Sequence, residues 1–316
     1  MVFSDKEGPE PVYAWTDSDG KTNVLEIGER GVLCYMYEPL DSNSKARREE
    51  TYKVYHHLYN PQGTRFVTKG AGGSFPHHRG LFYGFNRISY EVDGTRKVAD
   101  TWHCSKGESQ THEKVLSSEE GPVLGRQLLA IDWHGQDGNV FAKEQRELTA
   151  YNTKDGTLIE FASRFSSEVG KVKLDGDPQH AGFQFRASQD VPDKTSKETY
   201  YLRPDGKDVP GSFRNWPNVK THVNLPWNAL SFVLGETRYT CCYLDSPKNP
   251  KEARFSERDY GRFGSDFEAE LDTNKPLDVN YRIWLQVGEQ TVEGVQAISN
   301  NFVNPIVVEA RGEPAP

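Results

Sequence analysis

The chain has 316 residues and a mass of 35.8 kDa, enough for one large β domain or two ordinary domains. Its 46 acidic and 38 basic residues give a formal net charge of −8, so it lacks the basic surface that binding to nucleic-acid phosphates requires. No stretch approaches the ~18–20 uninterrupted apolar residues that span a bilayer. We therefore expect neither nucleic acid nor a membrane as a partner.

Nothing in the sequence divides the chain. It has no linker rich in proline, glycine or serine, no low-complexity tract and no fixed-period repeat, so we expect residues 1–316 to form a single domain. Four cysteines do not make a disulfide framework in a chain of this length. The N-terminal residues lack the pattern of a secretory signal, which indicates a cytoplasmic protein or the mature form of an exported one.

Alternating apolar and polar residues predict β-strands along most of the chain. In chain order they are expected at 23–27, 32–37, 81–92, 122–134, 139–151, 157–165, 179–188, 228–234, 238–244 and 281–287. Turn signals such as Asp93-Gly94 separate them. One helix is expected at 291–298, where Thr291 can cap the first turn. The pattern predicts an all-β fold, a large antiparallel β-sandwich with a short C-terminal helix.

The first candidate site lies in residues 73–84, where two histidines and an arginine stand between glycines before an aromatic run. His77 and His78 can change charge near neutral pH or bind a metal, and Arg79 offers a fork of donors for carboxylate or hydroxyl oxygens. Tyr83 follows in the aromatic run. The plainer interpretation is a pair of histidines that flank a turn.

A second candidate is the strand at 177–187. His180, Gly182, Gln184 and Arg186 alternate with apolar residues, so they share one face of the strand. If the apolar face packs on the core, the polar face presents an imidazole, an amide and a guanidinium beside the gap left by glycine. Such a face suits a sugar-binding cleft, and an ordinary solvated strand face is the alternative.

The segment 100–112 holds two further histidines and a tryptophan. A hairpin that turns at Lys106-Gly107 would bring His103 and His112 face to face, and Trp102 precedes the first of them. Together with His77, His78 or His180 they would form a three-histidine site for a divalent metal ion with an open coordination position. Histidines with a structural role and no metal are the alternative.

Two more segments combine charges and aromatic rings. Residues 251–264 suit an irregular loop that holds Glu257 or Asp259 as a general base oriented by Arg258 or Arg262, although a surface patch of salt bridges fits equally. His222 and Trp227 stand close together further upstream; an indole can stack on a sugar ring, but a core tryptophan is the commoner case.

Several common motifs for cofactor binding and catalysis are absent from the sequence. The sequence has no Gly-x-Gly-x-x-Gly, no phosphate loop, no Gly-x-Ser-x-Gly and no Cys-x-x-Cys. These absences disfavour nucleotide cofactors and serine hydrolysis.

Six motifs resemble the bacterial PmoA-like domain family, which is common in planctomycetes. They lie at 55–61, 75–84, 99–103, 177–182, 225–228 and 254–261, so the resemblance covers nearly the whole chain. The family's label borrows the name of a methane monooxygenase subunit. We do not expect that activity, because the oxygenase subunit is a membrane protein and this sequence has no apolar stretch long enough to span a membrane. The resemblance implies instead a fold distantly similar to the galactose-mutarotase-like β-supersandwiches, although the mutarotase spacing around the catalytic histidine is missing.

The mutarotase-like folds hold a sugar on the concave face of a large antiparallel sheet, where histidines and a carboxylate do acid/base chemistry. By residue type and strand position, His78, His180 and Glu257 fit those roles. PmoA-like proteins also tend to accompany sugar dehydrogenases and isomerases, and many carry signal peptides. The resemblance therefore implies sugar chemistry and a periplasmic or secreted mature protein.

Together these observations favour a carbohydrate-active enzyme of glycoside hydrolase, lyase or epimerase type that acts on a saccharide or oxidised sugar. His78 and His180 would exchange protons with the sugar, and Glu257 would be the opposing base. The side chains expected to bind substrate are His77, Arg79, Tyr83, Trp102, Gln184, Arg186, His222, Trp227 and Arg258. The alternatives are a metal-dependent sugar enzyme built on His103 and His112, and a carbohydrate-binding protein without catalysis.

Overall fold

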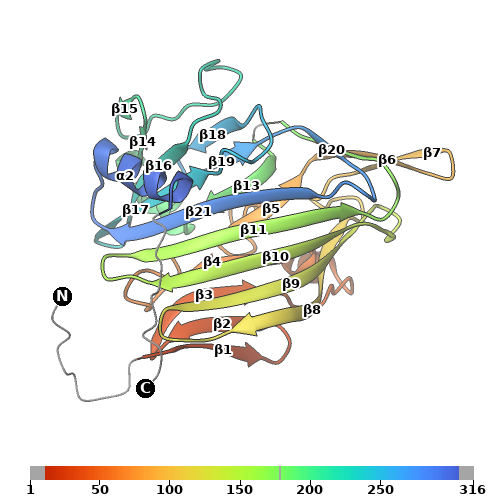
Figure 1. Cartoon of the computed structure of the whole chain (residues 1–316), viewed down its shortest axis with the longest axis horizontal. Coiled ribbons are helices and arrows are strands. Elements are labelled where there is room, and N and C mark those ends of the chain that lie inside the picture. Colours follow the sequence, from red (N-terminus) through yellow and green to blue (C-terminus); the bar gives the residue numbers. More distant parts are fainter. Residues whose placement is uncertain (1–10, 178, 306–316) are drawn as a thin grey trace, which may run out of the picture.

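The computed structural model describes residues 11–177 and 179–305, and antiparallel β-sheets dominate it (Figure 1). One sheet has eight strands. In their order across the sheet they are β1 (Tyr13–Ser18), β2 (Thr22–Ile27), β3 (Arg30–Met36), β4 (Tyr55–Leu58), β5 (Leu81–Phe85), β13 (Ala181–Arg186), β19 (Arg262–Asp266) and β18 (Arg254–Arg258).

A nine-stranded sheet covers one face of the first, and a small four-stranded sheet extends from one end. The nine strands are β15 (Gly206–Lys207), β14 (Tyr200–Arg203), β16 (Trp227–Leu234), β17 (Thr237–Asp245), β21 (Leu277–Val287), β11 (Thr157–Ser167), β10 (Val140–Asn152), β9 (Leu124–His134) and β8 (Ser109–Glu119). The four are β20 (Ala269–Leu271), β12 (Val172–Asp175), β6 (Arg87–Val92) and β7 (Thr95–Ala99).

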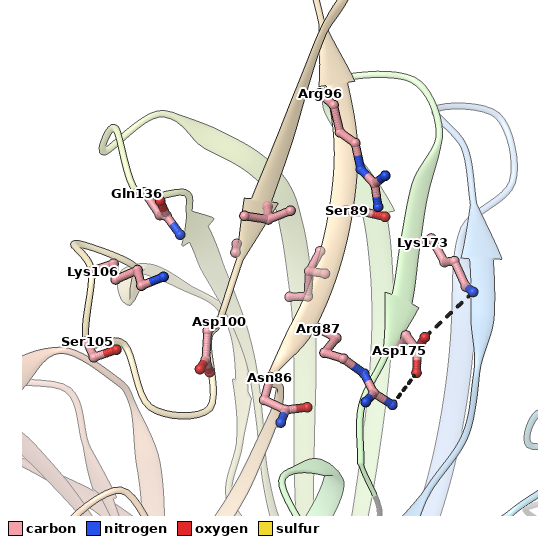
Figure 2. A pocket seen from close by; sticks show the side chains of 13 residues that line it. Asn86, Arg87, Ser89, Arg96, Asp100, Ser105, Lys106, Gln136, Lys173 and Asp175 are labelled. Carbon is pink, nitrogen blue, oxygen red and sulfur yellow. Dashed lines mark hydrogen bonds and ion pairs between the residues drawn. The ribbon is translucent and has the colours of Figure 1, made fainter.

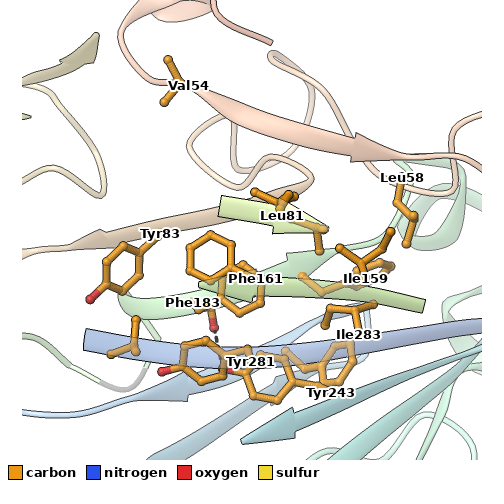
Figure 3. Packing of buried hydrophobic residues seen from close by; sticks show 14 of the residues in the cluster. Val54, Leu58, Leu81, Tyr83, Ile159, Phe161, Phe183, Tyr243, Tyr281 and Ile283 are labelled. Carbon is orange, nitrogen blue, oxygen red and sulfur yellow. Dashed lines mark hydrogen bonds between the residues drawn. The ribbon is translucent and has the colours of Figure 1, made fainter. Parts of the chain in front are cut away.

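The core fills the space between the two large sheets, as Figure 3 shows. Phe183 of β13 stacks on Phe161 of β11 with ring centroids 4.2 Å apart, and Tyr83 and Tyr281 pack around the pair. The predicted parity is thus confirmed for the alternate residues of these strands, which all face this interior: Ile159, Phe161, Phe165, Ala181, Phe183, Phe185, Ala187, Tyr281, Ile283 and Leu285. The fold class predicted from the sequence, an antiparallel β-sandwich, is correct.

Helix α2 (Val292–Val303) begins at the predicted place, since the hydroxyl of Thr291 accepts a hydrogen bond from the Gly294 N–H at 3.0 Å. Its buried Val295 packs against Trp227, so this tryptophan belongs to a second apolar cluster. A shorter helix, α1 (Lys45–Thr51), was not predicted from the sequence. A π-helical turn (Val191–Thr195) and a 3-10 turn (Ser196–Glu198) complete the helical elements of the described chain.

Three sequence predictions of local structure are wrong. The single strand expected at 81–92 is divided at Asn86 into β5 and β6, which belong to different sheets. The irregular loop expected at 251–264 contains the hairpin of β18 and β19, which turns at Gly261, where φ is +76°. The hairpin expected to turn at Lys106-Gly107 does not form, because β8 begins only at Ser109 and pairs with β9.

The two faces of the eight-stranded sheet carry different side chains. On the inner face of β13 and β19, Phe183, Phe185 and Phe263 join the core. On the opposite face, which we call the outer face, stand Gln184 and Arg186 of β13 and Arg262 and Asp266 of β19. These polar residues are nevertheless buried, because loops cover the outer face.

Candidate functional site

Four histidines from three separate segments meet in the loops over the outer face. The His77 ring lies 4.3 Å from that of His78 and 4.5 Å from that of His103, and the His103 ring lies 4.9 Å from that of His180. His78 and His180 are 6.3 Å apart and nearly parallel. The expectation that histidines from 77–78, 103 and 180 gather in one place is therefore met.

Two of the four imidazoles are oriented by carboxylates. His103 Nδ1 lies 2.8 Å from Asp100 Oδ2, and His180 Nδ1 lies 2.7 Å from Asp177 Oδ1. Because an ionised carboxylate only accepts hydrogen bonds, each Nδ1 is the donor, and in the neutral form of the ring Nε2 then carries the lone pair. Burial alone would raise the pKa of Asp177, but hydrogen bonds from His180, Asn86 and the Gln179 N–H lower it to about 2.

His78 is the buried member of the cluster. Both of its ring nitrogens lack a hydrogen-bond partner among the described residues, as does Nε2 of His77. Burial, reinforced by Arg262, holds the pKa of His78 well below its usual range, and burial beside Lys53 lowers that of His77 to about 2. These imidazoles are therefore neutral near pH 7.

Aromatic rings surround His78. Trp102 packs edge-on to it at 5.6 Å and forms a small apolar cluster with Tyr55 and Phe82. Trp102 is fully buried, so it supports the site from below and its faces are not open to a sugar. Phe75, which is 47% exposed and stacked on Tyr260 at 4.9 Å, is the aromatic surface that solvent reaches.

The sheet beneath the histidines contributes charged groups with unused hydrogen-bonding capacity. Arg262 donates from Nη1 to Gln184 Oε1 at 3.1 Å, and Arg186 donates to the backbone carbonyl of Tyr260. Nε and Nη2 of both guanidinium groups have no partner within the part of the chain that the structure describes. Buried donors without partners are costly in a folded protein, so their presence here indicates a place where a ligand or water supplies oxygen atoms.

Asp266 adds an acid to the same face. Neither of its carboxyl oxygens has a hydrogen-bond partner among the described residues, and the side chain is fully buried. Burial raises its pKa to about 8, although Arg254 acts in the opposite direction. Gly182 lies beside it, and a Cβ there would meet the backbone of Ser265 and Asp266. Gly182 thus lets β13 and β19 approach closely next to this acid.

Two cavities flank the loop at 100–108. One, of about 410 Å³, is lined by His77, His103 and Pro76 together with residues of α1 and gives the histidines access to solvent. The other, of about 380 Å³, lies on the far side of the loop, where Asp100, Arg87 and Lys173 are among its lining residues (Figure 2). The ion pairs of Arg87 and Lys173 with Asp175 already occupy one wall of this second cavity.

The structure does not bring His112 to the other histidines. His112 lies on β8, where its Nδ1 is 3.3 Å from the Tyr35 hydroxyl and its ring packs on Tyr37. The expected pairing of His103 with His112 is wrong because the intervening hairpin does not form. One ring nitrogen each of His77, His103 and His180 instead lies within 4.8 Å of those of the other two.

Glu257 lies on the other side of the sheet. On β18 it shares the inner face with Phe255, and its carboxylate accepts hydrogen bonds from Arg203 Nε at 2.7 Å and from Asn228 Nδ2 at 2.7 Å. His222 Nε2 is 3.3 Å away, so this predicted binding residue belongs to the same inner cluster. The sheet separates Glu257 and His222 from the four histidines, and the predicted catalytic grouping of Glu257 with His78 and His180 is not formed.

Three other predicted binding residues have structural partners. Arg79 donates to the backbone carbonyls of Pro76, Glu49 and Glu50 and stacks on Tyr52, so it fastens the histidine loop to α1. Tyr83 lies in the core, and Arg258 donates to the carbonyl of Glu257 while it packs against Phe213. By contrast, Gln184 and Arg186 stand on the outer face where the sequence placed them.

Sequence reasoning missed several residues of this site. Asp100 and Asp177 each stand three positions before a histidine, a spacing that is visible in the sequence and suits a turn in which the carboxylate meets the imidazole. Asp266 and Lys53 carry no such local signal. Lys53 is buried, with its Nζ 3.3 Å from the carbonyl oxygen of His77, and burial lowers its pKa to about 8.

Comparisons with solved structures find distant similarity over most of the chain. An aldose epimerase homologue from C. elegans is 8% identical with a TM-score of 0.38, over 88% of this chain and 99% of that one. A galactose mutarotase-like protein from Clostridium acetobutylicum is 8% identical with a TM-score of 0.41, over 88% of this chain and 99% of that one. The GH36 alpha-galactosidase AgaB from Geobacillus stearothermophilus is 11% identical with a TM-score of 0.45, over 89% of this chain and 42% of that one. Such low scores assign no role to any residue.

Among the residues that the structure describes, no helix has the length and apolar character needed to cross a bilayer.

Two further comparisons concern the sequence. No curated protein matches the chain. The model of one protein family matches residues 22–300, which include all four histidines and both aspartates of the site. The chain therefore belongs to DUF6807, a family of unknown function.

Proposed function

We propose that this protein is a carbohydrate-active enzyme that binds a saccharide or oxidised sugar at the histidine cluster and acts on it by hydrolysis, elimination or epimerisation. The observation that carries this proposal is the gathering of four imidazoles, of which His78 lies close enough to the buried Arg262 and Arg186 to feel their charge, while both guanidinium groups have unused donors. Sugars and sugar acids are dense in the oxygen acceptors that such donors require. The resemblance to PmoA-like proteins, which accompany sugar-processing enzymes, supports the same substrate class.

Within this proposal the residues have distinct tasks. His78, whose ring nitrogens are both free, transfers a proton to or from the sugar, and His180 contributes its free Nε2 to the same reaction centre. Asp266 is the carboxyl group on this face and takes the place that the sequence gave to Glu257. Phe75 supplies the apolar surface against which a sugar ring packs. The enzyme acts in the periplasm or outside the cell.

Substitution of His78 or His180 by alanine should lower turnover by about 10²–10⁴-fold, because each variant removes a proton-transfer or reaction-centre group. The assay is release or conversion of sugar from a panel of neutral oligosaccharides, uronate-containing oligosaccharides and oxidised sugars. His112→Ala is the matched control, since His112 contacts Tyr35 and Tyr37 away from the cluster.

The same assay tests the alternative of a binding protein. Saturable binding of a glycan without any conversion would show that the site recognises sugars but does not catalyse. Full activity of both histidine variants would remove the cluster from the reaction.

A further inference from the structure

Three of the four histidines lie together near the surface of the cluster, and the fourth is buried beneath them. His77, His103 and His180 are half-buried and offer ring nitrogens within 4.8 Å of one another, whereas His78 is buried beneath them. In a tetrahedral site with Zn–N bonds of about 2.0–2.1 Å, ligand nitrogens stand ~3.3 Å apart. Small rotations of the three rings would bring their nitrogens to that spacing.

The hydrogen bonds that these rings make also favour a metal site. Asp100 and Asp177 hold the Nδ1–H of His103 and His180, which fixes the tautomer that leaves Nε2 as a lone-pair donor. His77 Nε2 is buried and has no partner among residues 11–177 and 179–305. Carboxylate-held imidazoles of this kind are the usual surroundings of histidine ligands to metal ions.

Other uses of an aspartate–histidine pair fit less well. When such a pair activates a nucleophile, the free Nε2 contacts a serine, threonine or cysteine side chain. Within the described part of the chain, the side-chain hydrogen bonds of His103 and His180 run only to their aspartates. The rings of His103 and His180 instead lie 4.9 Å apart, and each offers a nitrogen within 4.8 Å of the other and of His77, an arrangement that a shared cation explains.

Charge balance also favours a divalent ion. The pair of aspartates carries two negative charges directly behind the ligands, and imidazoles that bind an ion through a lone pair add none. A 2+ ion would be neutralised by these carboxylates, and its fourth position would open toward the cavity lined by His77 and His103. A water or sugar oxygen bound there would be polarised.

We propose that His77, His103 and His180 bind one divalent transition-metal ion, with Asp100 and Asp177 orienting two of the ligands. Three imidazoles and an open position suit Zn²⁺ in particular. The use of the ion in catalysis rests on the proposed function, whereas its binding does not.

The test uses full-length protein without a polyhistidine tag, stripped of metal and titrated with Zn²⁺ and with Co²⁺. We expect one ion per chain by elemental analysis and an intense visible absorption of the Co²⁺ form, as four-coordinate Co²⁺ gives. His103→Ala and His180→Ala should lose at least 100-fold in affinity. Asp177→Asn, which keeps the shape of the side chain, should lose about 10–100-fold. His112→Ala should bind as the native protein does.

Circular dichroism of each variant separates loss of a ligand from loss of the fold. A native protein that takes up no stoichiometric ion, or a folded His180→Ala variant with native affinity, would overturn the metal centre. Neither result touches the sugar assay, which is judged by turnover. A protein that binds the ion and converts no sugar would keep the metal centre and remove the proposed function.

Discussion

Replacing Glu257 by alanine should lower the free energy of unfolding by about 3 kcal/mol or more, because it leaves the buried Arg203 without its main counter-charge. Arg203 is 1% exposed and donates two hydrogen bonds to this carboxylate. Urea unfolding measures the change as a shift of the midpoint at constant slope. Such a loss identifies Glu257 as a structural residue.

The lowered pKa of Glu257 reflects the same contacts with Arg203 and corresponds to a loss of similar size. Burial would raise it, but the hydrogen bonds and charges of Arg203 and His222 lower it from 4.5 to about 2. A depressed carboxyl pKa stabilises the fold above the unfolded value of 4.5, and this contribution is lost as the pH falls through the folded value near 2. A difference of about 2.5 units corresponds to roughly 3 kcal/mol.

Two further variants sharpen this test. Glu270→Ala removes an exposed glutamate whose one ion pair among the described residues is with Lys171, so the free energy of unfolding should change by less than about 0.5 kcal/mol. Glu257→Gln keeps the shape and should be less destabilising than Glu257→Ala. If Glu257→Ala were as stable as the native protein while its sugar turnover vanished, the original assignment of Glu257 as a catalytic base would return.

Asp266 should have the opposite pH signature. Its folded pKa of about 8 exceeds the unfolded value of 3.8, so between these pH values the folded protein keeps a proton that the unfolded chain releases. Stability conferred by this group is therefore complete below about pH 4 and is lost as the pH rises toward 8. The difference of about four pKa units sets an upper limit of about 6 kcal/mol.

Asp266→Asn, which mimics the protonated acid, isolates this effect. The free energies of unfolding of native protein and variant should be similar at pH 4, and the variant should become the more stable by several kcal/mol at pH 9. Asp278→Asn, an exposed change beside Arg164, is the control and should show no such trend between these pH values. A constant difference between the native protein and Asp266→Asn at both pH values would mean that Asp266 is ionised throughout.

The sequence was most informative where alternation decides burial. Ile159, Phe161 and Phe165 were expected on one face of a strand, and all three lie in the core. The hydrophobic period is a local property, so it can be read without knowledge of the partner strands. For the same reason Gln184 and Arg186 were placed on the correct face, although the loops that bury that face could not be foreseen.

The sequence failed where chemistry depends on distant pairing. Glu257 was grouped with the histidines by residue type, but its position on β18 directs it to Arg203 and Asn228 of the opposite sheet. His112 was paired with His103 through a turn that does not form. Asp266 has no motif around it, and its environment arises from the approach of β13 to β19. Each of these outcomes is set by contacts between segments far apart in the chain.

The two aspartate–histidine pairs are built alike. Asp100 Oδ1 accepts from the backbone N–H of Trp102 and of His103, and Asp177 Oδ1 accepts from that of Gln179, so each carboxylate closes its own turn before it meets the imidazole three residues later. Part of the orientation of each ring is thus local, but Asn86 also donates to Asp177, and Glu108 accepts from the N–H of Asp100. Transplanting an Asp-x-x-His turn into an unrelated scaffold should therefore align the imidazole only when the host also supplies a polar partner for the aspartate.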